Sequence, residues 1–265
     1  MNHLPYASVT GITERGQSEA IRNRLRARGL EGVSDRRLVF GILGSRKTLL
    51  DRKLNKYPHR YPRAEQMSHL FTQSNPMDPL DLWLHYCDDT KEGDTTTLFQ
   101  RVSEAIEVCL PEEGHLSGVS GPTGIQINAV WPDPVEMAKI AAEFPEMDIC
   151  LQVGPRAMEQ KPPNMPAFYE AIDSYAWKID HVLLDFSADD GKALDLSVAQ
   201  ELAYALRSEY PCLGVGIAGG LCAERIYEAA HLLCSIPRIS TDMEGAVRIP
   251  TDGGGILDID RAVDG

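Results

Sequence analysis

Short apolar runs alternate with helix-like segments along the whole chain. The runs are rich in Val, Ile and Leu and end at Gly, Pro, Asp or Ser, which is typical of buried parallel strands. In the longer segments between them, apolar residues recur at the three- and four-residue spacing of an amphipathic helix. The pattern therefore predicts repeated βα units, with strands at 6–12, 37–43, 82–87, 124–130, 148–153, 182–185, 214–218 and 238–242.

The same pattern places a helix after most of these strands. Gly29 is expected to cap the first helix, and Pro134 is expected to open the fourth. Two long segments, 49–62 and 154–164, also follow strands and carry Pro, Lys and Arg, so we expect them to be loops that act as lids. The expected helices are 17–28, 63–71, 97–109, 134–144, 166–176, 197–208, 223–234 and a short one that starts near 258.

Eight such repeats in 265 residues predict an α/β fold, a (β/α)₈ TIM barrel that forms a single domain over residues 1–265. The structural alternative is an open doubly wound sheet. That fold usually carries a GxGxxG turn after its first strand, and the sequence has none there. Because barrel enzymes build their active sites at the carboxyl ends of the strands, candidate functional residues are expected at those ends.

Composition narrows the possible partners. The net charge of −13 disfavours nucleic acid and anionic membranes as partners and leaves a small molecule as the expected ligand. No apolar run reaches the length of a membrane span, and no signal peptide is visible. The six cysteines form no CxxC pair, which indicates reduced thiols in a cytoplasmic protein.

An acid and a glycine pair end two consecutive strands. Asp185 follows an apolar run, and a carboxylate at a barrel strand end is placed to move a proton. Gly219 and Gly220 end the next strand, where their N–H groups and the following helix can bind a phosphate. The alternatives are that Asp185 pairs with Lys192 or caps its loop, and that the glycines only permit a tight turn.

Further polar residues end other strands. Asp242 and Glu244 end strand eight, which neighbours strand one in a closed barrel, although an ion pair between Glu244 and Arg248 is an equal alternative. His85 ends strand three and is either a functional or a hydrogen-bonded structural histidine. Amides at strand ends suit sugar hydroxyls, unless they satisfy one another; they are Gln126, Asn128 and Gln152.

Six short motifs resemble those of phosphoribosylanthranilate isomerase, a barrel enzyme of tryptophan biosynthesis that converts an aminoaldose phosphate into an aminoketose. The similarity is scattered over nearly the whole chain and is strongest over 182–245. The motifs are Thr10-Gly11-Ile12-Thr13, Pro58-His59-Arg60-Tyr61, Ile125-Gln126-Ile127-Asn128-Ala129, Leu183-Leu184-Asp185-Phe186, Ala218-Gly219-Gly220-Leu221 and Thr241-Asp242-Met243-Glu244-Gly245.

The resemblance implies roles for several of these residues. Asp185 corresponds to the acid that protonates the sugar ring oxygen, and Arg60 to the arginine that holds the substrate carboxylate. The other substrate-binding positions are His85, Gln126, Asn128 and Asp242, and the phosphate-binding positions are Gly219, Gly220 and Gly245.

One departure from the family affects the chemistry directly. The family's general base is a cysteine on strand one, and this chain has Thr10 there. A threonine hydroxyl is too weak a base to replace a thiolate at neutral pH. Glu244 is therefore the expected replacement base, paired with Asp185 as the acid.

The sequence thus predicts a divergent isomerase that acts on a phosphorylated pentose or its N-glycoside without a metal or other cofactor. Two alternatives stay open. One is a phosphosugar-binding barrel without turnover, which the missing cysteine favours. The other is a lyase or hydrolase that uses Asp185 and Glu244 as paired carboxylates.

Overall fold

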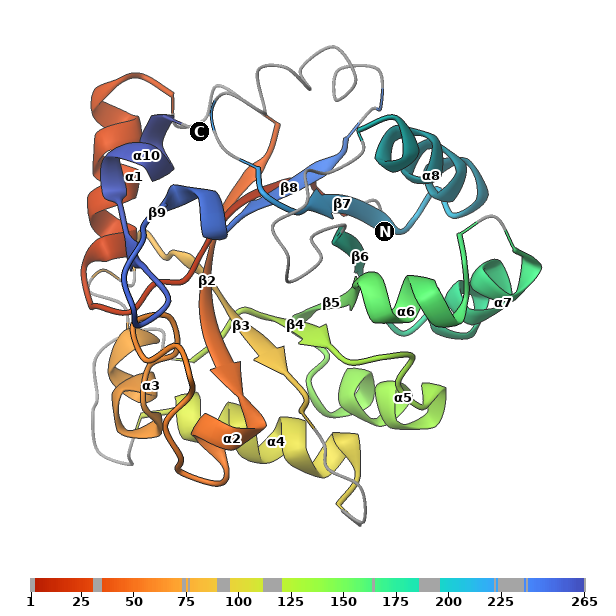
Figure 1. Ribbon diagram of the computed structural model, residues 1–265, viewed down its shortest axis with the longest axis horizontal. Helices are drawn as coiled ribbons and strands as arrows, with labels where there is room; N and C mark the ends of the chain where they lie inside the picture. Colours follow the sequence, from red (N-terminus) through yellow and green to blue (C-terminus); the bar gives the residue numbers. More distant parts are fainter. Residues whose placement is uncertain are drawn as a thin grey trace.

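The computed structural model describes residues 3–30, 35–72, 75, 77–89, 96–111, 121–163, 165–185, 196–221, 223, 236 and 238–264. Eight parallel strands form a closed barrel in the order β1 to β8, with β8 paired to β1 (Figure 1). The expected (β/α)₈ architecture is confirmed. The strands are β1 (Tyr6–Thr10), β2 (Arg37–Ser45), β3 (Asp81–Cys87), β4 (Gly124–Asn128), β5 (Asp148–Val153), β6 (His181–Asp185), β7 (Gly214–Ala218) and β8 (Ser240–Met243).

Helices surround the strands on the outside of the barrel (Figure 1). The first and last of the described helices, α1 and α10, pack against each other on one side of the barrel. No helix in the described ranges is both long and apolar enough to cross a bilayer. The helices are α1 (Gln17–Ala27), α2 (Arg46–Leu49), α3 (Ala64–Leu70), α4 (Leu98–Cys109), α5 (Pro134–Glu143), α6 (Pro155–Gln160), α7 (Pro166–Tyr175), α8 (Leu196–Glu209), η1 (Gly245–Val247) and α10 (Ile259–Asp264).

Strand residues alternate between two cores. Outward side chains such as Val9 pack beneath the helices, whereas inward side chains fill the barrel interior. Glycines make room for large inward neighbours: a Cβ on Gly41 would lie 2.7 Å from the ring of His85. The cysteines of the described ranges are free thiols. The inner apolar cluster consists of Tyr6, Val39, Trp83, Cys150, Leu183 and Ala218.

Several element boundaries differ from the expected ones. Strand β1 ends at Thr10, because Gly11 has a φ of 100° that turns the chain away. Strand β2 continues to Ser45, which also caps α2. Strand β4 ends at Asn128 rather than at 130, and β8 starts at Ser240 rather than at 238. The expected helix 223–234 lies outside the described residues except for its first position.

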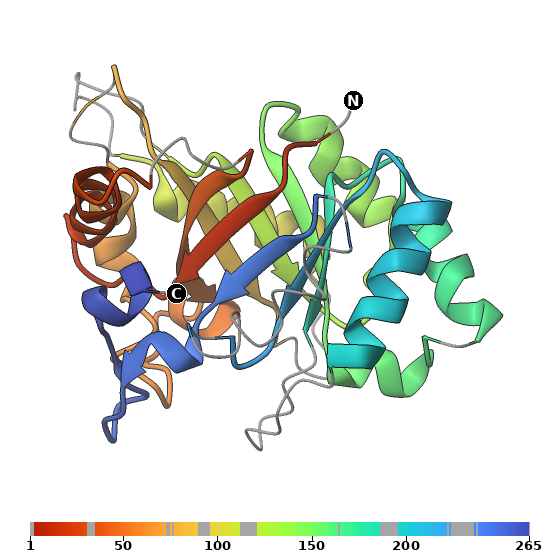
Figure 2. The same ribbon diagram turned by 90° about the horizontal axis from the view of Figure 1, so that it is seen from above.

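The two segments expected to be lids are each ordered by local contacts. The segment 154–164 contains α6, which Gly154 and Pro155 open. The segment 49–62 packs on an unforeseen hairpin of β9 (Arg248–Ile249) and β10 (Ile256–Leu257), through a hydrogen bond from the His59 amide to the Gly253 carbonyl. Figure 2 shows the strand arrows pointing to the side of the molecule that carries this hairpin.

Candidate active site

A cavity of about 570 Å³ opens at the carboxyl ends of the strands. Its size suits a drug-sized or smaller ligand. Seven of the residues expected from the sequence line it, namely Arg60, His85, Gln126, Asn128, Gln152, Asp185 and Glu244. The other four do not: Asp242 is buried beside Thr10 within the barrel, and Gly219, Gly220 and Gly245 lie outside the lining.

A buried chain of hydrogen bonds connects strands β8, β1 and β3. The hydroxyl of Thr10 donates to Oδ1 of Asp242 at 2.7 Å. Because a hydroxyl has one hydrogen, the Thr10 oxygen must then accept from Nδ1 of His85, which lies 3.2 Å away. Thr10 occupies the position where the resemblance places a catalytic thiolate, and its hydroxyl connects Asp242 to His85 by hydrogen bonds.

His85 is placed as a neutral base at the cavity. Burial lowers its pKa to about 3, so the ring is uncharged at neutral pH. Since Nδ1 carries the hydrogen that Thr10 accepts, Nε2 carries a free lone pair. That nitrogen is buried and has no hydrogen-bond partner among the described residues. His85 is one of the residues that line the cavity.

Asp242 is the acid at the other end of the chain. Burial, with a smaller contribution from the negative charge of Asp185, raises its pKa to about 6, although the hydrogen bonds from Thr10 and Ser8 oppose the shift. At neutral pH the carboxyl is therefore mostly ionised. Its Oδ2 lies 4.0 Å from Nδ1 of His85, close enough to stabilise an imidazolium.

A second chain of hydrogen bonds ends at Asp185. Nε2 of Gln126 donates to Oε1 of Gln152 at 3.0 Å, and Nε2 of Gln152 donates to Oδ2 of Asp185 at 2.7 Å. The two glutamines thus partly satisfy each other, as the structural alternative expected. However, Oε1 of Gln126 is buried without a partner among the described residues and is available to a ligand hydroxyl. Asn128 is exposed at the cavity rim.

Glu244 pairs with a different arginine from the one that the sequence suggested. Its carboxylate forms an ion pair with Arg60 from the segment 49–62, whose guanidinium also lies 5.6 Å from the ring centre of Tyr57. Arg248 instead donates to the backbone carbonyls of Gly11 and Gly255, both at 3.0 Å. The expected alternative of a Glu244–Arg248 bridge is therefore wrong, because Arg248 is occupied in fixing the end of β1 and the hairpin.

The glycine turn after β7 has a backbone that favours glycine. Gly219 and Gly220 have φ angles of 114° and 64°. The helix start expected to complete a phosphate site with them falls at 222–235, which is largely outside the described residues. Gly245 opens η1, and a Cβ there would meet no atom within 4 Å. The phosphate site stays a prediction.

Sequence reasoning missed several cavity residues. Lys56 and Arg156 supply cations, and Tyr57 and Tyr61 supply aromatic rings. In the sequence, only the basic and proline-rich composition of the two long segments pointed to these residues. Apolar residues do not recur at a regular spacing in either segment, so the sequence could not predict where their side chains point. The sequence also could not predict that Thr10 connects Asp242 to His85, because this connection depends on the pairing of β8 with β1.

No protein-family model and no curated protein matches the sequence. Among solved structures, the catalytic domain of a hyperthermophilic chitinase from Pyrococcus furiosus aligns with a TM-score of 0.52 at 11% identity, over 98% of this chain and 91% of that chain. A cube-shaped, highly porous protein cage designed by fusing symmetric oligomeric domains aligns with a TM-score of 0.49 at 10% identity, over 99% and 71%. The chitinase similarity shows the fold alone.

Proposed function

We propose that this barrel is an isomerase that moves protons between carbons of a phosphorylated pentose or its N-glycoside. One observation carries the proposal: His85, whose Nε2 has no hydrogen-bond partner among the described residues, and Asp185 line the same cavity, and each is held by its own chain of hydrogen bonds. The resemblance to phosphoribosylanthranilate isomerase supports the assignment of Asp185 as the acid.

The reaction begins with opening of the sugar ring. In its protonated form the carboxyl of Asp185 gives its proton to the ring oxygen as the C1–O bond breaks, which leaves a positively charged C1=OH⁺ or iminium C1=N⁺ group. Nε2 of His85 then takes the C2 proton, and the electrons of the C–H bond form a 1,2-enol or enolamine. The nearby Asp242 carboxylate stabilises the imidazolium that results.

The second half of the reaction restores both groups. The imidazolium of His85 returns its proton to C1, and the hydroxyl proton on O2 passes to Asp185. A ketone is left at C2, and the enzyme is back in its starting protonation state. Each side chain thus exchanges one proton with one part of the substrate, as expected for general acid–base catalysis.

Binding is proposed to use the charges around the cavity. The cations Lys56, Arg60 and Arg156 suit an anionic substrate, although the net charge of the protein is negative. Glu244 already neutralises Arg60, so a substrate anion at Arg60 has to displace that carboxylate. This ion pair favours His85 over Glu244 as the base and weakens the paired-carboxylate hydrolase alternative.

Solvent exchange tests the proposal whether or not the substrate carries an N-substituent. The purified chain is incubated in D₂O with ribose 5-phosphate and, separately, with phosphoribosylanthranilate, and deuterium at C1 and C2 is followed by NMR. We expect exchange in the wild type, and a loss of roughly 100-fold or more in His85→Asn. His69→Asn, which changes a histidine on α3 outside the cavity, is the matched control and should exchange at the wild-type rate.

The alternatives give different results in the same experiment. Binding of either sugar phosphate without exchange at any carbon would support the non-catalytic binding barrel. Release of the free base or of water-derived products, with no exchange at C2, would support the hydrolase or lyase reading. Exchange that persists in His85→Asn would remove His85 as the base.

A further inference from the structure

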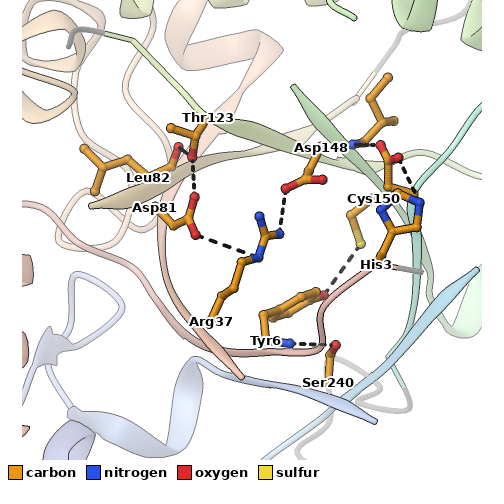
Figure 3. A network of polar contacts seen from close by, with 11 residues as sticks. His3, Tyr6, Arg37, Asp81, Leu82, Thr123, Asp148, Cys150 and Ser240 are labelled. Atoms are coloured by element: carbon orange, nitrogen blue, oxygen red, sulfur yellow. Dashed lines mark hydrogen bonds and ion pairs between the residues drawn. The ribbon is translucent and has the colours of Figure 1, made fainter. Parts of the chain in front are cut away.

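Two histidines and an aspartate meet at the end of the barrel opposite the cavity. His3 precedes β1, Asp148 opens β5 and His181 opens β6. One potential metal-ligand atom from each lies within 4.8 Å of the other two. Figure 3 shows His3 and Asp148 at this end of the barrel, with Arg37 lying between Asp81 and Asp148.

His181 is a buried histidine whose ring is held by aromatic neighbours. Its side chain is 0% exposed, and neither ring nitrogen has a hydrogen-bond partner among the described residues. The rings of Tyr6 and Trp83 lie 5.2 and 5.7 Å from it, which fixes its position. Burial lowers the pKa of His181 to about 3, so the imidazole is neutral and has a lone pair to offer. Such a buried polar group without a partner requires a physical explanation.

The other two residues each keep one atom available. Nε2 of His3 contacts Oδ1 of Asp180 at 3.3 Å, so its Nδ1 is left to bind a ligand. Oδ2 of Asp148 accepts a hydrogen bond from Arg37 at 2.6 Å, and no described group bonds its Oδ1. An acid that holds the far nitrogen of a histidine is the usual outer partner of a metal ligand.

We propose that His3, Asp148 and His181 bind a zinc ion that has a structural role. Two imidazoles with one carboxylate suit zinc, whereas calcium and magnesium prefer oxygen ligands. The local charge agrees with a cation, because three carboxylates, those of Asp81, Asp148 and Asp180, lie near two guanidinium groups, that of Arg37 and that of Arg238, which donates to the His3 carbonyl. Tetrahedral zinc places neighbouring ligand atoms about 3.4 Å apart, so small side-chain rotations close the site.

The ion would join three parts of the fold. It would tie the segment before β1 to the first residues of β5 and β6, across the barrel's amino-terminal end. The active sites of barrel enzymes lie at the other end, so this ion is assigned to stability and not to the reaction. Removal of zinc is therefore expected to lower the melting temperature and to leave the residues around the cavity in place.

Metal titration of the full chain tests the site. The protein is stripped with a chelator, dialysed, and titrated with Zn²⁺ by calorimetry and with Co²⁺ by visible absorption. We expect one equivalent of each ion, with the intense visible bands of tetrahedral cobalt, and a melting temperature that rises with added Zn²⁺. His3→Ala and His181→Asn should weaken Zn²⁺ binding by at least about tenfold, and His69→Ala should not change it.

Each outcome supports the site or overturns it. His3 is partly exposed, so His3→Ala should fold even if His181→Asn does not, and a melting curve without metal checks each variant. Uptake of one ion that falls in His3→Ala, and in His181→Asn where that variant folds, but not in His69→Ala, supports the site. Absence of Zn²⁺ uptake by the stripped wild type, or uptake equal in wild type and His3→Ala, would overturn it.

Discussion

Thr10 and Asp242 share a buried hydrogen bond of 2.7 Å across the seam where β8 closes onto β1. The same threonine oxygen lies 3.2 Å from Nδ1 of His85. In the proposed mechanism, His85 therefore takes the part of the base that the resemblance would place at Thr10. The hydroxyl fixes the tautomer of this histidine, whose side chain lines the cavity and whose other nitrogen has no hydrogen-bond partner among the described residues.

The hydroxyl of Thr10 is expected to matter for the rate. Thr10→Val keeps the side-chain shape but cannot accept from His85 or donate to Asp242, so His85 loses its orientation and Asp242 becomes a buried acid without that hydrogen bond. We expect solvent exchange to fall by roughly tenfold or more, whereas Thr10→Ser should keep most of it. Stopped exchange in both variants, with intact melting curves, would point to packing rather than to the hydroxyl.

The pH dependence of the reaction should report Asp242. His85 becomes an imidazolium during turnover, and the ionised Asp242 stabilises it. Because burial raises the pKa of Asp242 to about 6, kcat/KM should show an acidic limb that rises as the pH increases through about 6. Asp242→Asn should lower the rate and abolish this acidic limb. Retention of the limb in Asp242→Asn would assign it to another group.

Ionisation of Asp242 is expected to favour the reaction but to lower the stability of the folded chain. The pKa of Asp242 is about 6 in the folded chain, above the value of about 3.9 expected when unfolded. Its contribution to stability is therefore fully present below about pH 4 and is lost as the pH rises through about 6. Asp242→Asn, which mimics the protonated form, should raise the free energy of unfolding at pH 8 by about 2 to 3 kcal/mol.

Thermal unfolding measures this difference. For a chain of this length, about 2 to 3 kcal/mol corresponds to several degrees in melting temperature. Wild type and Asp242→Asn should melt together near pH 4 and separate near pH 8. Asp252→Asn, which changes an exposed carboxyl on the β9–β10 turn, should track the wild type at both pH values. An Asp242→Asn variant that is less stable at pH 8 would show that the ionised carboxylate is stabilising.

The barrel was predictable because its signal is local and repeated. Each strand is a short apolar run, and only parallel strands separated by helices fit that alternation in one chain. Boundaries were less predictable because they depend on single backbone angles, such as the positive φ of Gly11. Helix α6 and the β9–β10 hairpin are too short to show a period, so composition alone pointed to loops.

The candidate site was partly predictable for a related reason. Residues at strand ends must gather at one mouth once the barrel closes, and Asp185, His85 and Gln126 do line the cavity. Their partners were not predictable, because partners depend on register and on the path of long segments. Arg60 reaches Glu244 only because the segment 49–62 packs on the hairpin, a contact that no sequence period encodes.

Variants of the ion pair between Arg60 and Glu244 are expected to change substrate binding without changing the chemical step. Both side chains are only partly buried, at 25% and 30% exposure, and both line the cavity. Glu244→Gln removes the charge that competes with a substrate anion for Arg60. We therefore expect KM for an anionic sugar substrate to fall several-fold, while kcat stays within about twofold, because His85 and not Glu244 takes the proton.

The reciprocal variant and a control complete the test. Arg60→Gln removes the cation itself and should raise KM by roughly tenfold with a smaller effect on kcat. Glu65→Gln changes an exposed acid on α3 and should leave both constants unchanged. A fall of kcat by about 100-fold or more in Glu244→Gln would identify Glu244 as the base and would restore the acid–base pair with Asp185 that the sequence predicted.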